Sequence, residues 1–252
     1  MLDTKPVIIA AVTTTPVSAA SEQASGPRPN RDPDAIPDGK ATDGIKPVVS
    51  LNASVVSDYR FRGITQSAGR VAVQGSIEVN SPTGFYTGIW GSSSSAYEGA
   101  HTEFDFYGGY RLNVTSVDVD IGIISYLYPG ADGVSSAEIY ATAAKGLGDA
   151  TIKLGISYAP HQSELGQGDG LYLFTDALKP VPGLPLVVHG HIGRETGMNT
   201  ITGSPKLDWL LGVDTHAGPA TISLAWVDAR YSGRGSQDHR SGSVVAAVAL
   251  DF

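Results

Sequence analysis

Apolar and polar residues alternate in short runs along the chain from residue 48 to the C-terminus. A period of two predicts a β-strand whose two faces meet different surroundings. In the final run, one parity carries Val244, Ala246, Val248, Leu250 and Phe252. We expect twelve such strands, at 49–62, 70–80, 85–91, 102–112, 117–128, 136–145, 150–158, 170–178, 186–194, 207–216, 221–231 and 242–252.

The connections between these runs alternate in length. Tight turns, such as 81–84, alternate with longer polar links, such as 92–101. Membrane barrels have short periplasmic turns and longer outer loops, and an even number of strands returns both chain ends to the periplasm. A chain that finishes on a full strand also needs a partner for it, which closure onto the first strand supplies. The pattern predicts an all-β, antiparallel up-and-down transmembrane β-barrel of about 12 strands.

The first 47 residues have a different composition, which predicts a disordered N-terminal segment. Residues 1–20 combine Lys5, a short apolar run and a group of small residues, which indicates a degenerate secretory signal; a plain disordered tail is the alternative. Residues 21–47 predict a Pro-rich disordered linker. We therefore expect a single folded domain, the outer-membrane β-barrel, at 48–252.

Charge and composition narrow the classes of function. Charged residues make up 17% of the chain, below the roughly 25% that is usual in soluble domains. The formal charge of -8 argues against nucleic acid as a partner. The absence of Cys excludes disulfides and thiolate metal sites. No run approaches the ~18 apolar residues of a spanning helix, so a membrane-embedded form must be a barrel.

Aromatic residues gather near the ends of the predicted strands. We expect them to form two girdles at the membrane interfaces, although a general preference of aromatic residues for strands explains the same positions. The set near the long links is Tyr59, Phe61, Tyr97, Phe104, Phe106, Tyr126, Tyr128, Tyr158, Tyr172, Phe174 and Tyr231, and the set near the short turns is Phe85, Tyr86, Tyr110 and Phe252.

One motif carries a family resemblance. It reads Ser57-Asp58-Tyr59-Arg60-Phe61-Arg62-Gly63-Ile64-Thr65-Gln66-Ser67. This motif resembles the hallmark of the TorF-type porins, also known as the Gcw_chp family, and shorter matches follow at 74–75, 84–92, 103–110, 128–130 and 138–140. The resemblance implies a Gram-negative outer-membrane barrel with a transport role, and it carries over no catalytic residues. The weak signal and the added Pro-rich stretch depart from the family pattern.

Charged residues of the inward parity indicate a pore. If the first strand ends at Arg62 near the outer rim, the upper lumen gathers Asp58, Arg60, Arg62, Glu103, Asp105, Glu138 and Asp208. Opposed charges inside a pore set a transverse field that tunes ion preference. Acids outnumber bases there, so we expect passive diffusion of small polar solutes or ions with a mild cation preference.

Two alternatives stay open at this point. In the first, the same charged groups pair with one another and plug a structural barrel that has no pore activity. In the second, the chain is a secreted soluble β-sandwich that binds a ligand or partner, since short strands with turns between them also fit that fold.

Other chemistry has little support. His189 and His191 share one strand face, but zinc needs at least three good ligands, so we expect neither a metal nor another cofactor. Without a G-x-S-x-G elbow, a phosphate-binding loop or a zincin pattern, the chain is not expected to be an enzyme. The expected partners are outer-membrane lipid, small polar solutes or ions, and the barrel-assembly machinery, which would recognise the C-terminal strand that ends on Phe252.

Overall fold

The computed structural model describes residues 46–97, 99–162, 168–197, 200, 204–232 and 242–252. The predicted signal-like segment, 1–20, and all but the last two residues of the predicted linker, 21–47, lie outside the described residues. Among the residues that are described, no helix is long and apolar enough to cross a membrane.

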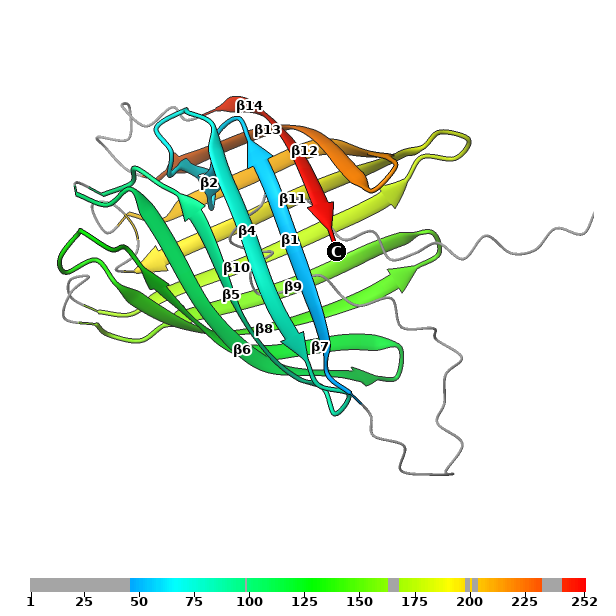
Figure 1. The fold of residues 1–252 in the computed structure, drawn as a ribbon, viewed down its shortest axis with the longest axis horizontal. Helices are drawn as coiled ribbons and strands as arrows, with labels where there is room; N and C mark the ends of the chain where they lie inside the picture. The colour runs from blue at the N-terminus through cyan, green and yellow to red at the C-terminus, as the bar shows by residue number, and fades with distance from the viewer. Residues whose placement is uncertain (1–45, 98, 163–167, 198–199, 201–203, 233–241) are drawn as a thin grey trace, which may run out of the picture.

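The described chain forms a closed barrel in which each strand pairs antiparallel with its neighbours (Figure 1). This confirms the predicted fold class and the predicted number of strands. The barrel strands are β1 (Val48–Val56), β4 (Ala72–Asn80), β5 (Phe85–Ser93), β6 (Thr102–Val114), β7 (Val117–Leu127), β8 (Ser136–Leu147), β9 (Ala150–Ala159), β10 (Gly170–Pro180), β11 (Leu186–Gly197), β12 (Lys206–Ala217), β13 (Ala220–Tyr231) and β14 (Ser243–Asp251).

Closure depends on the pairing of the first and last strands. Ala53 of β1 lies opposite Leu250 of β14 on one side and Gly75 of β4 on the other. Two backbone hydrogen bonds between Leu51 and Phe252, of 3.1 and 2.9 Å, continue the ladder to the end of the chain. Because every barrel strand has two neighbours, no strand edge is left to bind another chain or to remain unsatisfied in lipid.

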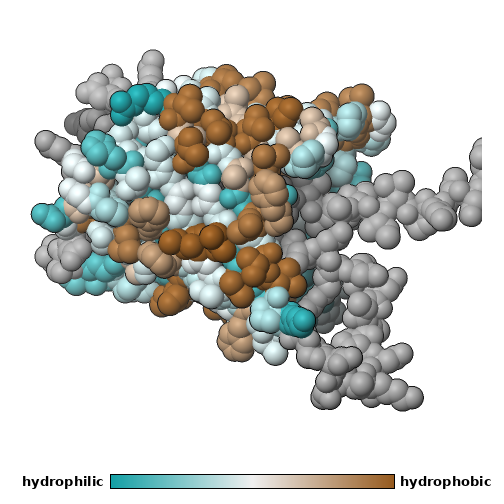
Figure 2. Space-filling model, viewed as in Figure 1, coloured by the Kyte–Doolittle hydropathy of each residue, from teal (hydrophilic) through white to brown (hydrophobic). Residues whose placement is uncertain are grey.

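The two faces of the sheet differ sharply in exposure. In β7, Ile123 is 60% exposed, whereas the adjacent Ile124 is 2% exposed. Hydrophobic side chains lie over the outer surface of the strands (Figure 2). An apolar surface of this extent around a closed sheet needs hydrocarbon around it. The soluble β-sandwich is therefore wrong, because the sheet closes on itself and its apolar face lies outside.

The first predicted strand, 49–62, is wrong in its second half. The strand β1 ends at Val56, and two short strands, β2 (Arg60–Phe61) and β3 (Ile64–Thr65), pair with each other instead of with the barrel. We call residues 57–67 the inward hairpin, because their side chains are buried or half-buried among residues of the barrel wall. Alternation alone could not reveal this bend, since apolar and polar residues continue to alternate through it.

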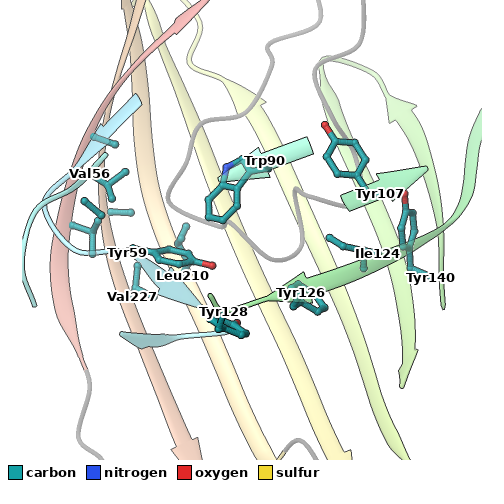
Figure 3. Packing of buried hydrophobic residues seen from close by; sticks show 14 of the residues in the cluster. Val56, Tyr59, Trp90, Tyr107, Ile124, Tyr126, Tyr128, Tyr140, Leu210 and Val227 are labelled. Carbon is teal, nitrogen blue, oxygen red and sulfur yellow. The ribbon is translucent and has the colours of Figure 1, made fainter. Parts of the chain in front are cut away.

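The predicted outer girdle of aromatic residues is also wrong for part of its set. The lumen holds Tyr59, Tyr126, Tyr128, Tyr172 and Phe174, all of which are at most 9% exposed. Several of these rings pack into one buried cluster with Trp90 and Ile124 (Figure 3). Phe104, Phe106 and Tyr158 do face outward. Whether an aromatic side chain faces the lumen or the outside depends on its parity within the strand and not on its distance from the strand end.

We predict that a charge at the outer surface of mid-strand weakens the barrel according to its depth. Ile123→Arg is expected to lower the free energy of unfolding by about 2–4 kcal/mol, whereas Leu147→Arg, next to a short turn, is expected to cost about 0–1 kcal/mol. Urea unfolding of the two variants in phospholipid vesicles measures the difference. Equal, small effects at the two positions would contradict a lipid-facing exterior.

Candidate site inside the barrel

Local interactions hold the inward hairpin in shape. Arg62 and Gly63 are the two turn residues between the paired strands, and both have positive φ, of 46° and 80°. Two positive φ values define the tight turn that suits a two-residue hairpin. The Asp58 carboxylate accepts hydrogen bonds from Arg60 Nε at 2.6 Å and Thr65 Oγ1 at 2.5 Å. One carboxylate thus ties the two arms of the hairpin together.

Arg62 extends from the turn to two strands of the barrel wall. Its Nη1 donates to Glu195 Oε1 of β11 and its Nη2 donates to Glu138 Oε2 of β8, each at 2.5 Å. The guanidinium lies 4.1 Å from the centre of the Tyr172 ring, and the Arg62 side chain is 2% exposed. A buried charge is stable only when it is paired, and here two carboxylates compensate it. We call this interaction the Arg62 bridge.

The turn itself packs tightly against the wall. A Cβ atom placed on Gly63 would lie 2.7 Å from Ala229 Cβ and 2.8 Å from the carbonyl oxygen of Asp228, both in β13. Such contacts are too short for any side chain, so only glycine fits at this position. The left-handed backbone of Arg62 costs about 1–2 kcal/mol, which the two charge-assisted hydrogen bonds of the bridge offset.

Polar contacts continue from the bridge along the wall. Lys206 Nζ of β12 lies 2.7 Å from Glu195 Oε2, and the Tyr126 hydroxyl donates to Glu138 Oε2 at 3.3 Å. A second chain of contacts runs through His191, which lies 2.5 Å from Asp176 and 3.1 Å from Asp208. It continues to Lys153 Nζ, 2.9 Å from Asp176, and to the Tyr172 hydroxyl, 2.9 Å from Asp208. The interior of β8 to β12 is thus lined with paired charges.

A separate cluster lies nearer the short turns. Arg111 of β6 pairs with Glu78 of β4 at 2.7 Å and with Asp120 of β7 at 3.1 Å. Its guanidinium stacks 3.6 Å from the centre of the Tyr86 ring. The Tyr86 hydroxyl donates to Asp120 at 2.6 Å and also contacts the Tyr140 hydroxyl. This cluster braces the opposite side of the barrel in the same way, with charges paired across neighbouring strands.

The structure brings only some of the predicted pore residues together. Arg62 meets Glu138, whereas Arg60 pairs with Asp58 inside the hairpin. The remaining three predicted residues are buried on the wall, and Glu103, Asp105 and Asp208 are each at most 1% exposed. Glu103 accepts a hydrogen bond from the Tyr128 hydroxyl at 2.8 Å, and Asp208 contacts Tyr172 and His191.

Three residues of the site are not predicted as such from the sequence: Glu195, Lys206 and Tyr172. Glu195 shares inward parity with His189 and His191, so parity in β11 was the signal that could have found it. Lys206 lay one residue outside the predicted strand, and Tyr172 was assigned to the outer girdle. None of these positions reveals its partner from sequence, because Arg62 and Glu195 are 133 residues apart.

His189 and His191 pair with carboxylates. His189 Nδ1 lies 2.6 Å from Asp214, in parallel with the contacts of His191. Within the part of the chain that the structure describes, no group of three or more His, Asp or Glu residues is arranged to hold a metal ion. These pairs therefore contribute to the polar lining of the lumen.

The closed barrel, its apolar exterior and its charged interior define an outer-membrane β-barrel protein. The model of the family described as "Bacterial protein of unknown function (Gcw_chp)" matches residues 41–248, and the chain belongs to this family. Comparison with curated proteins gives no match.

Solved structures share the fold. The chain is similar to the KdgM porin, with a TM-score of 0.55, 7% identity, and coverage of 81% of this chain and 98% of that one. It is also similar to the NanC porin, with a TM-score of 0.53, 9% identity, and coverage of 81% and 99%. The KdgM porin in complex with disordered oligogalacturonate gives a TM-score of 0.50 at 7% identity, with coverage of 81% and 97%. At these identities the likeness concerns the fold.

We predict that two glycines with the same backbone conformation respond differently to a methyl group. Gly63→Ala is expected to destabilise the barrel because its Cβ meets the wall at 2.7 Å, in addition to the strain of its φ of +80°. Gly69→Ala, with a φ of +70° and nothing within 4 Å of its Cβ, is the matched control and bears only the strain, about 1–2 kcal/mol. Urea unfolding in detergent micelles compares them, and equal losses would show that the turn does not pack on β13.

Proposed function

We propose that this protein is an outer-membrane channel of the porin type, through which small polar solutes or ions diffuse passively. The observation that carries the proposal is the Arg62 bridge, which holds the inward hairpin across a charged lumen between β8 and β11. A hairpin fixed inside a barrel narrows the lumen and places charged groups where a solute must pass. The motif that holds Arg62 also supports a TorF-type assignment within the family.

Charge supports a mild cation preference. The described cations of the interior pair with carboxylates, and carboxylates outnumber them. The carboxylates are Asp58, Glu78, Glu103, Asp105, Asp120, Glu138, Asp176, Glu195, Asp208 and Asp214, against Arg60, Arg62, Arg111, Lys153 and Lys206. Acidic surplus lowers the energy of a cation in a narrow passage and raises that of an anion. A polyanion such as the oligogalacturonate in the KdgM complex would have to displace these carboxylates from their partners.

A second candidate is a plugged barrel that has a structural role. Burial favours it, since Tyr59 is fully buried and Arg62 is 2% exposed on its side chain. Rings and aliphatic side chains from several strands meet in the lumen beside the hairpin (Figure 3). Conduction then requires the hairpin to move, so current through the pure protein decides between the two functions.

The other parts of the proposal concern how the chain reaches the membrane. Residues 1–20 would direct export, 21–47 would link them to the barrel domain that begins at 48, and the strand ending on Phe252 would be recognised during barrel assembly. No catalytic role is proposed for any residue.

We predict discrete current steps when the pure protein is inserted into planar lipid bilayers. The expected permeability favours K⁺ over Cl⁻, because carboxylates exceed cations along the lumen. Reversal potentials in a KCl gradient measure the preference. Steady insertion, shown by heat-modifiable gel mobility, without any current steps would contradict the channel and favour the plugged barrel.

We also predict that Arg62→Met increases conductance and raises the K⁺ preference by about twofold or more, because Glu138 and Glu195 lose their shared cation and the hairpin loses its anchor. Arg70→Ala is the matched control, since Arg70 is exposed beyond the hairpin. The same bilayer recordings test both variants. An Arg62→Met channel with the conductance and reversal potential of the unaltered protein would show that the bridge does not control passage.

A further inference from the structure

The lumen has a second region, next to the hairpin, in which the charges are arranged differently. Four aromatic residues surround the Glu103 carboxylate there, and we call this set the acidic aromatic box. Its members are Tyr59 of the inward hairpin, Trp90 of β5, Tyr97 of the following link, Glu103 of β6 and Tyr128 after β7. The inward hairpin, the segment from β5 to β6 and the residue after β7 therefore contribute to one site near the loop end of the barrel.

Ring contacts and hydrogen bonds show that these residues are neighbours. The Tyr59 and Trp90 rings lie 5.4 Å apart and the Tyr97 and Tyr128 rings 4.6 Å apart, both pairs in inclined arrangements. The Tyr128 hydroxyl donates to Glu103 Oε1 at 2.8 Å. Tyr59 and Tyr97 also interact electrostatically with Glu103. Figure 3 shows Trp90, Tyr59 and Tyr128 around one part of the lumen, with the Tyr59 hydroxyl directed into it.

The box contains buried acceptors that the described residues satisfy poorly or not at all. The Tyr59 hydroxyl lies against the Glu103 carboxylate as a donor, but the geometry is too poor to satisfy Glu103 Oε2 or the hydroxyl fully, and both residues are 0% exposed. Gln74 of β4 is 3% exposed, and its Oε1 has no hydrogen-bond partner among the described residues. Its Nε2 donates to Ser92, which lies directly opposite Glu103 in the pairing of β5 with β6. Buried oxygens that are poorly satisfied are costly, so these acceptors favour the binding of an additional donor.

The charge of the box is also uncompensated. Among the described residues, no Lys, Arg or His forms an ion pair with Glu103, whereas Glu138 and Glu195 share Arg62. A buried carboxylate without a cation is costly while it is ionised, and a bound cation would compensate its charge. Aromatic faces around the same carboxylate add attraction for a cation.

We propose that the acidic aromatic box binds a primary ammonium group, R–NH₃⁺, of a small organic amine. An ammonium group has three N–H donors, which match the oxygens of Glu103, Tyr59 and Gln74, and a positive charge, which Glu103 and the surrounding rings stabilise. A quaternary ammonium fits the rings but offers no donor. An inorganic cation also binds oxygens, but it has no alkyl chain to pack against the aromatic rings.

The position of the box allows access from the loop end. Tyr97 is 38% exposed, while the members behind it are buried. Transport of amines through the barrel rests on the proposed channel function, whereas binding of an amine in the box does not require conduction.

Calorimetric titration of the full-length protein, folded in detergent micelles, tests the site without requiring current. We expect saturable binding of ethylammonium chloride, with affinity reduced about tenfold or more by Glu103→Gln, which removes a charge-assisted hydrogen bond. Tyr59→Phe is expected to weaken binding by about threefold or more, because it removes one acceptor and keeps the ring. Asp118→Asn, which removes a carboxylate near the short turns, is the matched control and is expected to bind as the unaltered protein does.

Three outcomes would overturn the site. These are no saturable binding of ethylammonium, binding of tetramethylammonium with equal affinity, or equal displacement by KCl. Heat-modifiable gel mobility shows whether each variant folds. If Glu103→Gln does not fold, Tyr59→Phe still tests the site. A barrel that binds ethylammonium but passes no current contradicts the channel and leaves the site intact, whereas a conducting barrel without binding contradicts the site alone.

Discussion

The interior of this barrel depends on the pairing of one buried cation, Arg62, with two buried carboxylates. Removing either side leaves uncompensated charge where water is largely excluded, and this is far more costly than the loss of a surface ion pair. The pairing has a geometric consequence, because Glu138 and Glu195 belong to β8 and β11 while Arg62 lies in the turn of the inward hairpin. Charge neutrality therefore fixes the hairpin in the lumen.

Two different sides of the lumen result from this arrangement. From β8 to β12, cations and carboxylates compensate one another in a continuous network that includes Lys206 and His191. Beside β5 and β6, aromatic rings surround Glu103, and the described residues there satisfy several buried oxygen acceptors poorly or not at all. The first side makes the interior rigid, and the second side provides the proposed binding site for an ammonium group.

Much of the fold follows from the sequence, because period-two alternation and the alternation of short and long connections are both local signals. The inward hairpin does not, since its turn, Arg62-Gly63, lacks the Asn or Asp that usually marks such turns and its alternation matches that of β1. The site was predictable only in part. Inward parity identified Glu138, but the meeting of Arg62 with Glu195 depends on closure of the whole barrel, and Tyr172 was misassigned because strand-end position outweighed parity.

The central claim is that residues 57–67 lie inside the barrel and not outside as a loop. Hydrogen exchange of the lipid-embedded protein tests it most directly, because the hairpin amides are bonded and enclosed, as for Gln66 N to Tyr59 O at 2.7 Å. The account predicts that peptides covering 58–66 exchange nearly as slowly as those of the strands. Exchange as fast as that of the link at 129–135 would contradict it.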